Sequence, residues 1–298
     1  MSANDAGVLV PQSHQIAVYK RRVRIKKVLQ TVFSHLLLLP LAILFLMPFF
    51  WMISTSLKTD RQVFAWPLVW IPSPLQWSNY PDALNFFPFW LFLRNTLFIA
   101  GACVVGALIS CSMVAYSLSC VPWKGRDILF LITISTLMLP YQVTMVPLFV
   151  VFTRLDWVGS YLPLIVPAFF GNAFFIFLLR QFFRTIPNDL IDAARIDGAS
   201  HPRIFAQIIL PLAKPALFTI VLFQFLNSWT DFMGPLIYLS NRRMYTISLG
   251  LQYFRLEHDT KWQLLMAASI MLTSPIIILF FFTQRTFVQG ITMTGLKG

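Results

Sequence analysis

Six long apolar blocks constrain this chain more than any other feature of its sequence. Each holds about twenty or more largely apolar residues, enough for a helix to cross about 30 Å of hydrocarbon. Hydrophobic residues make up 57% of the chain and charged residues 11%, whereas a soluble domain carries about a quarter charged residues. A water-soluble fold could not bury this much apolar surface. The blocks are 28–55, 90–119, 128–152, 161–183, 215–239 and 264–287.

These blocks predict an all-α fold, a polytopic membrane protein with six transmembrane helices. Backbone groups in lipid must be hydrogen-bonded within the protein, so that helices and closed β-barrels are the structures that span a membrane. The sequence lacks the segments of about ten residues with alternating hydrophobicity that are typical of a barrel. We therefore expect one transmembrane domain over residues 28–290.

The distribution of Lys and Arg predicts the orientation. An even number of spans puts both termini on the same side, and most of the 23 basic residues lie on that side. Loops rich in Lys and Arg stay in the cytoplasm, so we expect cytoplasmic tails at 1–27 and 291–298 and a cytoplasmic loop at 187–215. The first block is too long for a cleaved signal peptide. The first twenty residues are expected to be disordered.

The net charge of +12 has a simple explanation in these basic loops and their contact with anionic lipid. No basic stripe with interleaved aromatic residues indicates nucleic-acid binding. Three cysteines in the second block and four scattered histidines predict neither a disulfide framework nor a metal site. There is no glycine-rich nucleotide loop and no hydrolase motif. If the protein uses nucleotide energy, another chain must supply it.

A polar stretch, DAARIDGASHPRIFAQIILPLAKP, separates the fourth and fifth blocks. Its pattern predicts two short helices. Asn188 or Asp189 is the expected N-cap of the first, and Gly198 is expected to end it in the left-handed conformation. Ser200 should cap the second helix and Pro211 should end it. Small residues on this helix pair would allow close approach by another protein, although an ordinary interhelical loop is the simpler interpretation.

The same stretch resembles the EAA loop of importer permeases in the ABC transporter family. Asp192-Ala193-Ala194 is followed by Gly198, Ile208 and Leu210-Pro211 at the spacings of that loop, with Asp192 where the family usually has Glu. The resemblance implies that the loop couples the permease to an ATPase subunit, with Asp192 as the partner of a basic residue and Gly198 as the hinge. The implied coupling residues are Asp192, Ala193, Ala194, Asp197, Gly198, Ala199, Leu210 and Pro211.

Four further stretches, 139–149, 178–200, 229–239 and 284–298, resemble the carbohydrate-uptake branch of these permeases, of the six-span maltose-importer type. This implies a type I importer bundle in the bacterial inner membrane that passes a sugar or oligosaccharide and catalyses no reaction itself. The implied partners are a second, different permease, two ATPase subunits that bind ATP and Mg, an extracytoplasmic solute-binding protein and membrane lipid. No cofactor or metal is expected on this chain.

Polar residues in the fifth block predict a substrate path. Four of them are spaced at i, i+3, i+4 and i+7, which places them on one helical face, and polar groups within a span usually face the protein interior or a watery path. Amides and carboxylates can hydrogen-bond the hydroxyl groups of a sugar. The alternative is that they hold helices together. With one residue each from the third and fourth blocks, the candidates are Gln142, Asn172, Gln224, Asn227, Ser228 and Asp231.

Two functions of other classes fit the sequence less well than import of a sugar. A membrane-anchored DNA-binding regulator would need a basic recognition helix, whereas three aspartates balance three basic residues in the helix pair. A secondary transporter would usually need ion-coupling carboxylates at the bilayer centre, and no block has one in its middle. Import of a glycerol phosphate-type solute remains an alternative to import of a sugar.

Overall fold

The structure, a computed structural model, describes residues 12–255 and 260–295, with side chains over 19–283 of these ranges. The described residues form helices and contain no strand, which confirms the predicted all-α fold. Four segments are long and apolar enough to span a membrane: Tyr19–Ser56, Phe89–Cys120, Leu162–Phe183 and Trp262–Thr283. The count rises to six if each of two bent helix pairs is one span.

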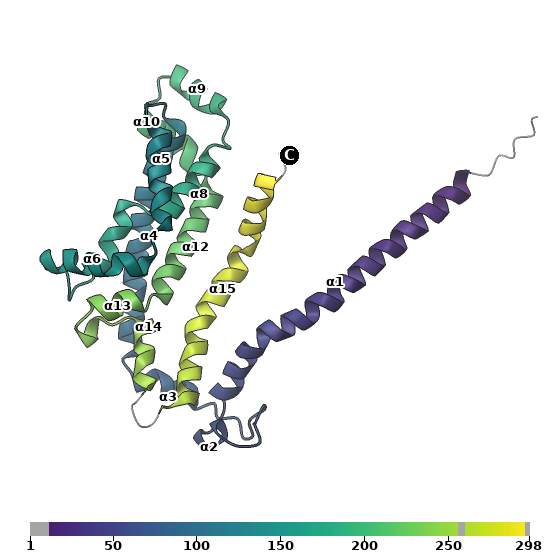
Figure 1. Ribbon diagram of the computed structural model, residues 1–298, viewed down its shortest axis with the longest axis vertical. Helices are drawn as coiled ribbons and strands as arrows, with labels where there is room; N and C mark the ends of the chain where they lie inside the picture. The colour runs from purple at the N-terminus through teal and green to yellow at the C-terminus, as the bar shows by residue number, and fades with distance from the viewer. Residues whose placement is uncertain (1–11, 256–259, 296–298) are drawn as a thin grey trace, which may run out of the picture.

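Helix α4 (Phe89–Cys120) is the centre of the bundle (Figure 1). Along it pack α8 (Ala173–Phe183), α12 (Lys214–Thr230) and the η2 turn (Val166–Phe170), which follows α7 (Leu162–Ile165). Small residues on a helix surface let neighbouring backbones approach closely in a membrane. Four of them, spaced four apart on α4, are buried: Cys103, Ala107, Cys111 and Ala115.

The third predicted span, 128–152, is wrong as one straight helix. α5 (Arg126–Ser135), extended by the η1 turn (Thr136–Met138), meets α6 (Tyr141–Arg154) at 100°. Figure 1 shows α6 running crosswise to α4 and reaching out from one side of the bundle. Pro140 explains the break, because it has no N–H to donate and its ring keeps Leu139 extended, at φ −84° and ψ 113°.

The fifth predicted span, 215–239, also ends earlier than predicted. α12 stops at Thr230, and the separate turn α13 (Met233–Tyr238) follows it. Asp231 is extended, at φ −64° and ψ 115°, and its Oδ1 accepts a hydrogen bond from Gly234 N at 3.0 Å. The carboxylate thus binds an N–H in the first turn of α13, whose N-cap residue is Phe232, while the extended backbone of Asp231 marks the end of α12. At its other end α12 meets the helical stretch His201–Leu212 at 79°, which makes the second bent pair.

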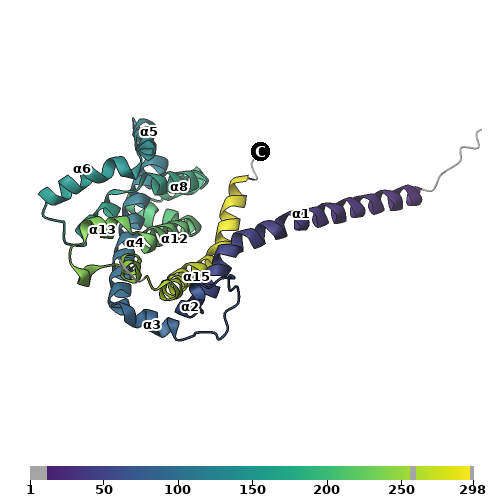
Figure 2. The same ribbon diagram turned by 60° about the horizontal axis from the view of Figure 1, so that its bottom comes forward.

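The helices at both ends of the described chain are longer than the predicted spans. α1 (Gln12–Ser56) begins well before residue 28, because Lys, Arg and Gln in this stretch favour helix. Residues 12–20 are therefore helical rather than disordered, and residues 1–11 of the predicted tail lie outside the described part. α15 (Trp262–Gly295) continues past 290, and residues 296–298 lie outside the description. One end of α1 packs against α15, while the rest projects away from the bundle (Figures 1 and 2).

Short elements gather at one end of the bundle, and α9 (Asn188–Ile196) and α10 (His201–Ile204) lie at the opposite end (Figure 1). This separation is what the predicted topology requires for the loop at 187–215. The elements at the first end are α2 (Asp60–Val63), α3 (Asn79–Phe86), η4 (Arg242–Met244), α14 (Ile247–Gly250) and η5 (Leu251–Phe254).

Candidate functional sites

The first candidate site is the helix pair α9–α10, which is part of the folded core. Ile191 of α9 and Ile204 of α10 are buried, and so is Ile209 of the π-helical turn η3 (Phe205–Ile209). These side chains join one apolar cluster with Leu179 and Phe183 of α8. Burial of an aliphatic side chain stabilises by about 1.5–3 kcal/mol, so the pair is held firmly against the bundle.

Gly198 ends α9 as predicted. It has φ +76°, and its N–H donates to Arg195 O at 3.0 Å while Ala199 N donates to Ala194 O at 2.9 Å. These two bonds form a Schellman motif, the usual helix end with glycine in the left-handed conformation. Nothing lies within 4 Å of a Cβ placed on Gly198. The requirement for glycine therefore comes from the backbone and not from crowding.

Two predicted boundaries in this loop are wrong. The N-cap of α9 is Pro187, at φ −58° and ψ 131°, and Asn188 is the first helical residue. Pro211 does not end the second helix, which continues through α11 (Leu210–Leu212). The π-helical turn just before Pro211 changes the backbone register, and such turns accommodate local disruption of the α-helical hydrogen bonds.

The predicted coupling residues divide between an exposed and a packed side. Asp192, Ala193, Asp197 and Gly198 are exposed, as is Pro211. Ala194 and Ala199 are half-buried and pack against the apolar cluster, and Leu210 is half-buried beside them in the second helix. The small residues therefore do not form one free surface, because half of them seat α9 on the bundle.

Sequence reasoning missed the most exposed apolar side chain of this loop. Ile196 is 87% exposed and stands beside Asp192 and Ala193 on the same short helix. An isolated exposed apolar residue is ordinary, but this one lies among the residues predicted to contact another chain. The signal was present in the sequence, because Ile191 and Ile196 are five apart and cannot both face the core from one turn.

Polar contacts tie the pair to the end of α4. Arg195 pairs with Asp192 at 3.2 Å and also donates to Cys120 O at 3.4 Å. The hydroxyl of Tyr116 contacts His201 Nδ1 at 3.2 Å. Asp192 thus pairs with a residue of its own helix, and an exposed ion pair of this kind is worth only about 0–1 kcal/mol. A basic residue of another chain could therefore take the place of Arg195.

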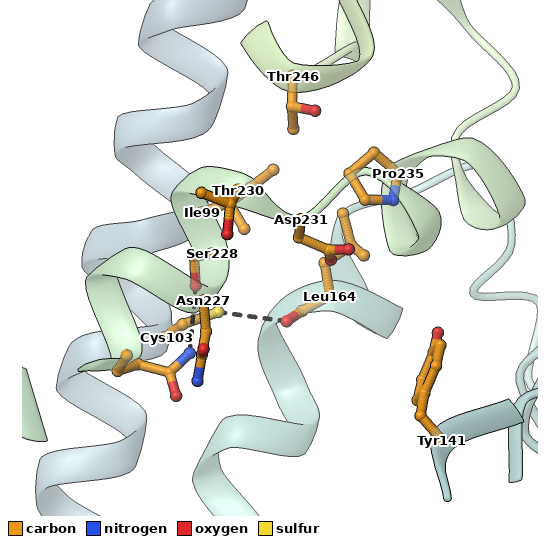
Figure 3. Close-up of a pocket in the computed structure, with 11 residues that line it drawn as sticks. Ile99, Cys103, Tyr141, Leu164, Asn227, Ser228, Thr230, Asp231, Pro235 and Thr246 are labelled. Carbon is orange, nitrogen blue, oxygen red and sulfur yellow. Dashed lines mark hydrogen bonds between the residues drawn. The ribbon is translucent and has the colours of Figure 1, made fainter. Parts of the chain in front are cut away.

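The second candidate site is a cavity of about 550 Å³ between α4, α12 and the ends of α6, α7 and α13 (Figure 3). Clefts that bind small molecules usually measure about 300–1,000 Å³. The predicted row on α12 lines it, so the structure brings these four residues together. The lining residues are Ile99, Cys103, Tyr141, Leu164, Gln224, Asn227, Ser228, Thr230, Asp231, Pro235 and Thr246.

Several hydrogen bonds fix the polar side chains of the cavity. Gln224 donates to Ser228 Oγ at 3.1 Å, one turn apart on α12. Cys103 donates to Leu164 O at 3.2 Å. Asp231 is held at its carboxylate by Gly234 N and at its carbonyl by the hydroxyl of Ser248, at 2.5 Å. Figure 3 shows the hydroxyl of Tyr141 directed toward the side where Asp231 lies.

The two other predicted path residues do not line this cavity. Asn172 is the N-cap of α8, where its Oδ1 accepts from Phe174 N at 3.0 Å and Phe175 N at 3.2 Å. Gln142 is exposed on α6, and its neighbour Tyr141 faces the cavity instead. The break at Pro140 turns α6 sideways and so decides which of the two residues faces inward. Sequence reasoning also missed Thr230 and Thr246.

The fold and these two sites define a helical membrane protein with a polar cavity in the bundle and a docked helix pair at one end. Among the described residues, no group of three or more His, Cys, Asp or Glu side chains could hold a metal ion. Residues 112–293 match the family of binding-protein-dependent transport system inner membrane components. The chain belongs to this family and is an ABC importer permease with several membrane-spanning helices.

Relatives cover most of the chain. It is 34% identical over 264 residues to the arabinooligosaccharides transport system permease protein AraQ of Bacillus subtilis, covering 87% of this chain and 92% of that one. AraQ of Halalkalibacterium halodurans is 38% identical over 210 residues, covering 70% and 75%. The sn-glycerol-3-phosphate transport system permease protein UgpE of Pectobacterium atrosepticum is 32% identical over 268 residues, covering 87% and 95%.

A solved structure has the same fold. It is a crystal structure of a bacterial ABC transporter involved in the import of the acidic polysaccharide alginate. The likeness has a TM-score of 0.76 with 26% sequence identity, and covers 89% of this chain and 97% of that chain. This agreement supports the type I importer bundle predicted from the sequence.

Proposed function

We propose that this chain is the membrane-spanning permease subunit of an ATP-driven, binding-protein-dependent importer for a sugar or oligosaccharide. The observation that carries the proposal is the polar cavity on α12, within a family of binding-protein-dependent transport components. Two AraQ relatives and the alginate importer support a saccharide as the transported solute. The cavity supplies amide, hydroxyl and carboxylate groups, which are suitable partners for sugar hydroxyls.

The proposal assigns energy coupling to the other end of the molecule. Two ATPase subunits bind ATP and Mg and contact the helix pair α9–α10 from the cytoplasm, where both termini of this chain also lie. The exposed residues available for that contact include Asp192, Ala193, Ile196, Asp197, Gly198 and Pro211. A second, different permease completes the path, and an extracytoplasmic protein delivers the solute. The chain itself is then non-catalytic.

Two alternatives receive different support. Import of a glycerol phosphate-type solute is a second candidate, because UgpE is 32% identical over most of this chain. A DNA-binding regulator is not supported, because the family is one of transport components. The exposed side chains of the helix pair are also of mixed charge rather than basic, with Asp189, Asp192 and Asp197 beside Arg195 and Arg203.

Uptake by the complete assembly tests the proposal. We expect proteoliposomes that contain both permeases, the ATPase and the binding protein to accumulate an arabino-oligosaccharide when ATP is hydrolysed, but not with a non-hydrolysable analogue. Asn227→Ala should lower uptake by about 5–30-fold, since a lost hydrogen bond is worth about 1–2 kcal/mol, while the subunits still copurify. Absence of ATP-dependent uptake of any saccharide would contradict the proposal.

A further inference from the structure

The cavity has a single acidic side chain in its lining. Besides Cys103, the lining holds seven polar side chains, and Asp231 is the one among them that is a carboxylic acid, a group that ordinarily ionises below neutral pH. None of the lining residues is Lys, Arg or His. The neutral polar groups are Tyr141, Gln224, Asn227, Ser228, Thr230 and Thr246.

The charge of Asp231 is not neutralised by an ion pair within the described part of the chain. The carboxylate accepts from a neutral backbone donor, Gly234 N, at 3.0 Å. Basic residues of the elements beside the cavity are exposed, and none of them lines it. They are Arg94 of α4, Arg154 of α6, Lys214 of α12, and Arg242 and Arg243 of η4. A charge that is partly shielded from water acts on its surroundings more strongly than one on the surface.

This arrangement distinguishes between two kinds of sugar. The hydroxyl groups of a neutral saccharide can donate hydrogen bonds to the carboxylate of Asp231, and charge-assisted bonds of this kind are stronger than neutral ones. They can also donate to, or accept from, the amide of Asn227 and the hydroxyl of Tyr141. A carboxylate or phosphate group on the solute would lie close to the carboxylate of Asp231. The repulsion between these like charges would weaken binding of the anionic solute.

We propose that Asp231 makes this cavity select neutral saccharides and exclude sugars that carry carboxylate or phosphate groups. The inference rests on the proposed function, because it names the substrate class of the same site. It favours a neutral oligosaccharide over the glycerol phosphate-type solute left as the second candidate. The hydrogen bond from Gly234 N positions the carboxylate of Asp231, and that bond alone would not require a negative charge.

The hydrogen bond to Gly234 N and the charge of Asp231 can be separated by substitution. In Asp231→Asn the amide oxygen can still accept from Gly234 N, so that this hydrogen bond is kept while the charge is lost. Asp82→Asn is the matched control, because Asp82 is exposed on α3 and does not line the cavity. A cysteine at Thr230, which lies beside Asp231 and lines the cavity, reports the local charge after the three native cysteines are replaced by Ser.

The test compares two thiol reagents of similar size on the assembled complex, one with a trimethylammonium group and one with a sulfonate group. We expect the cationic reagent to react faster with Thr230→Cys, and Asp231→Asn to reduce that preference by about tenfold, as a nearby partly buried charge would. Asp82→Asn should leave the preference unchanged. Equal effects of the two Asn variants, or no reaction at Thr230→Cys in any nucleotide state, would overturn the inference.

Uptake measurements separate this inference from the proposed function. In the same proteoliposomes, a neutral arabinotriose should be imported and should slow modification of Thr230→Cys, while a mannuronate dimer and sn-glycerol 3-phosphate should do neither. Import of either anionic solute with Asp231 intact would overturn the selection of neutral sugars and leave the importer itself established. Failure of every saccharide to enter would contradict the importer, whatever the reagents show.

Discussion

Gly198 belongs to the proposed coupling loop, and its backbone also has the left-handed conformation that favours glycine. A non-glycine residue in the left-handed conformation costs about 1–2 kcal/mol, and a β-branched residue is the least suited to it. We predict that Gly198→Val displaces the end of α9 and lowers transport, while Gly198→Asn, which tolerates positive φ, retains most of it. The measurement is ATP hydrolysis and solute uptake by the assembled complex, because loss of coupling lowers uptake relative to hydrolysis.

A charge reversal at Asp192, in the same loop, tests coupling in a second way. Asp192→Lys reverses the exposed carboxylate that pairs with Arg195 at 3.2 Å, and an interface built for a carboxylate should lose the most from that reversal. Asp189→Lys is the control on the same helix. Wild-type ratios of uptake to hydrolysis in both Gly198→Val and Asp192→Lys would show that α9 does not couple the two processes.

Lys58 is a buried residue that the proposed functions do not use. It follows the end of α1, is fully buried, and has its Nζ at 3.8 Å from the centre of the Trp51 ring. Nζ has no hydrogen-bond partner among the described residues. Burial disfavours the charged form and lowers the pKa of the Lys58 ammonium below its usual value. Asn79 holds the backbone here by donating to Ser56 O and Lys58 O, both at 2.8 Å.

The lowered pKa of Lys58 predicts a pH dependence of stability. Between the folded-state pKa and the usual lysine pKa, the unfolded chain binds more protons than the folded one, so the free energy of unfolding contributed by Lys58 rises with pH and falls as pH decreases. Lys58→Met should flatten this dependence and leave stability at neutral pH equal or higher, because no buried charge remains. Thermal unfolding of the purified complex across alkaline pH measures this; an unchanged slope would contradict it.

At the scale of elements, α4 offers a matched pair of glycines. A Cβ on Gly106 would lie 2.7 Å from the ring of Phe169 in η2, whereas nothing lies within 4 Å of one on Gly101. We predict that Gly106→Ala destabilises the fold by about 1–3 kcal/mol through overpacking. Gly101→Ala should be neutral or slightly stabilising, since alanine favours helix by about 1 kcal/mol. Thermal unfolding measures the stability of the two variants. Equal stability would contradict the prediction and show that Phe169 in η2 moves aside at little cost.

Some of these elements could be predicted from the sequence and others could not. The left-handed end of α9 at Gly198 and the polar row on α12 depend on local chemistry and helical spacing, and both are found in the structure. The bend at Pro140 and the end of α12 before Asp231 were missed, because an apolar run has the same composition whether or not the helix is broken within it. The break at Pro140 then turned Tyr141, rather than Gln142, toward the cavity.

At the scale of the whole molecule, one helix joins the two candidate sites. α12 begins at Lys214, directly after the helix pair that faces the proposed ATPase, and ends at Thr230 in the cavity. It contains 17 residues, so at about 1.5 Å per residue it spans about 25 Å without a break. A displacement of the helix pair can therefore reach the cavity through a rigid element, and α12 also packs along α4 and α15.

This connection predicts that access to the cavity depends on the nucleotide state. Single cysteines at Asn227 and Ser228, in a chain without the native cysteines, should react with a water-soluble thiol reagent from outside in one state and be protected in the other. Leu222 is buried and Phe225 stacks on Trp229 at 5.3 Å, so cysteines at these two control positions should stay unreactive in both states. Reactivity at Asn227 and Ser228 that is equal with and without ATP would mean that α12 carries no motion from the helix pair. The polar row would then be a fixed contact between helices, and the solute would have to pass along the second permease.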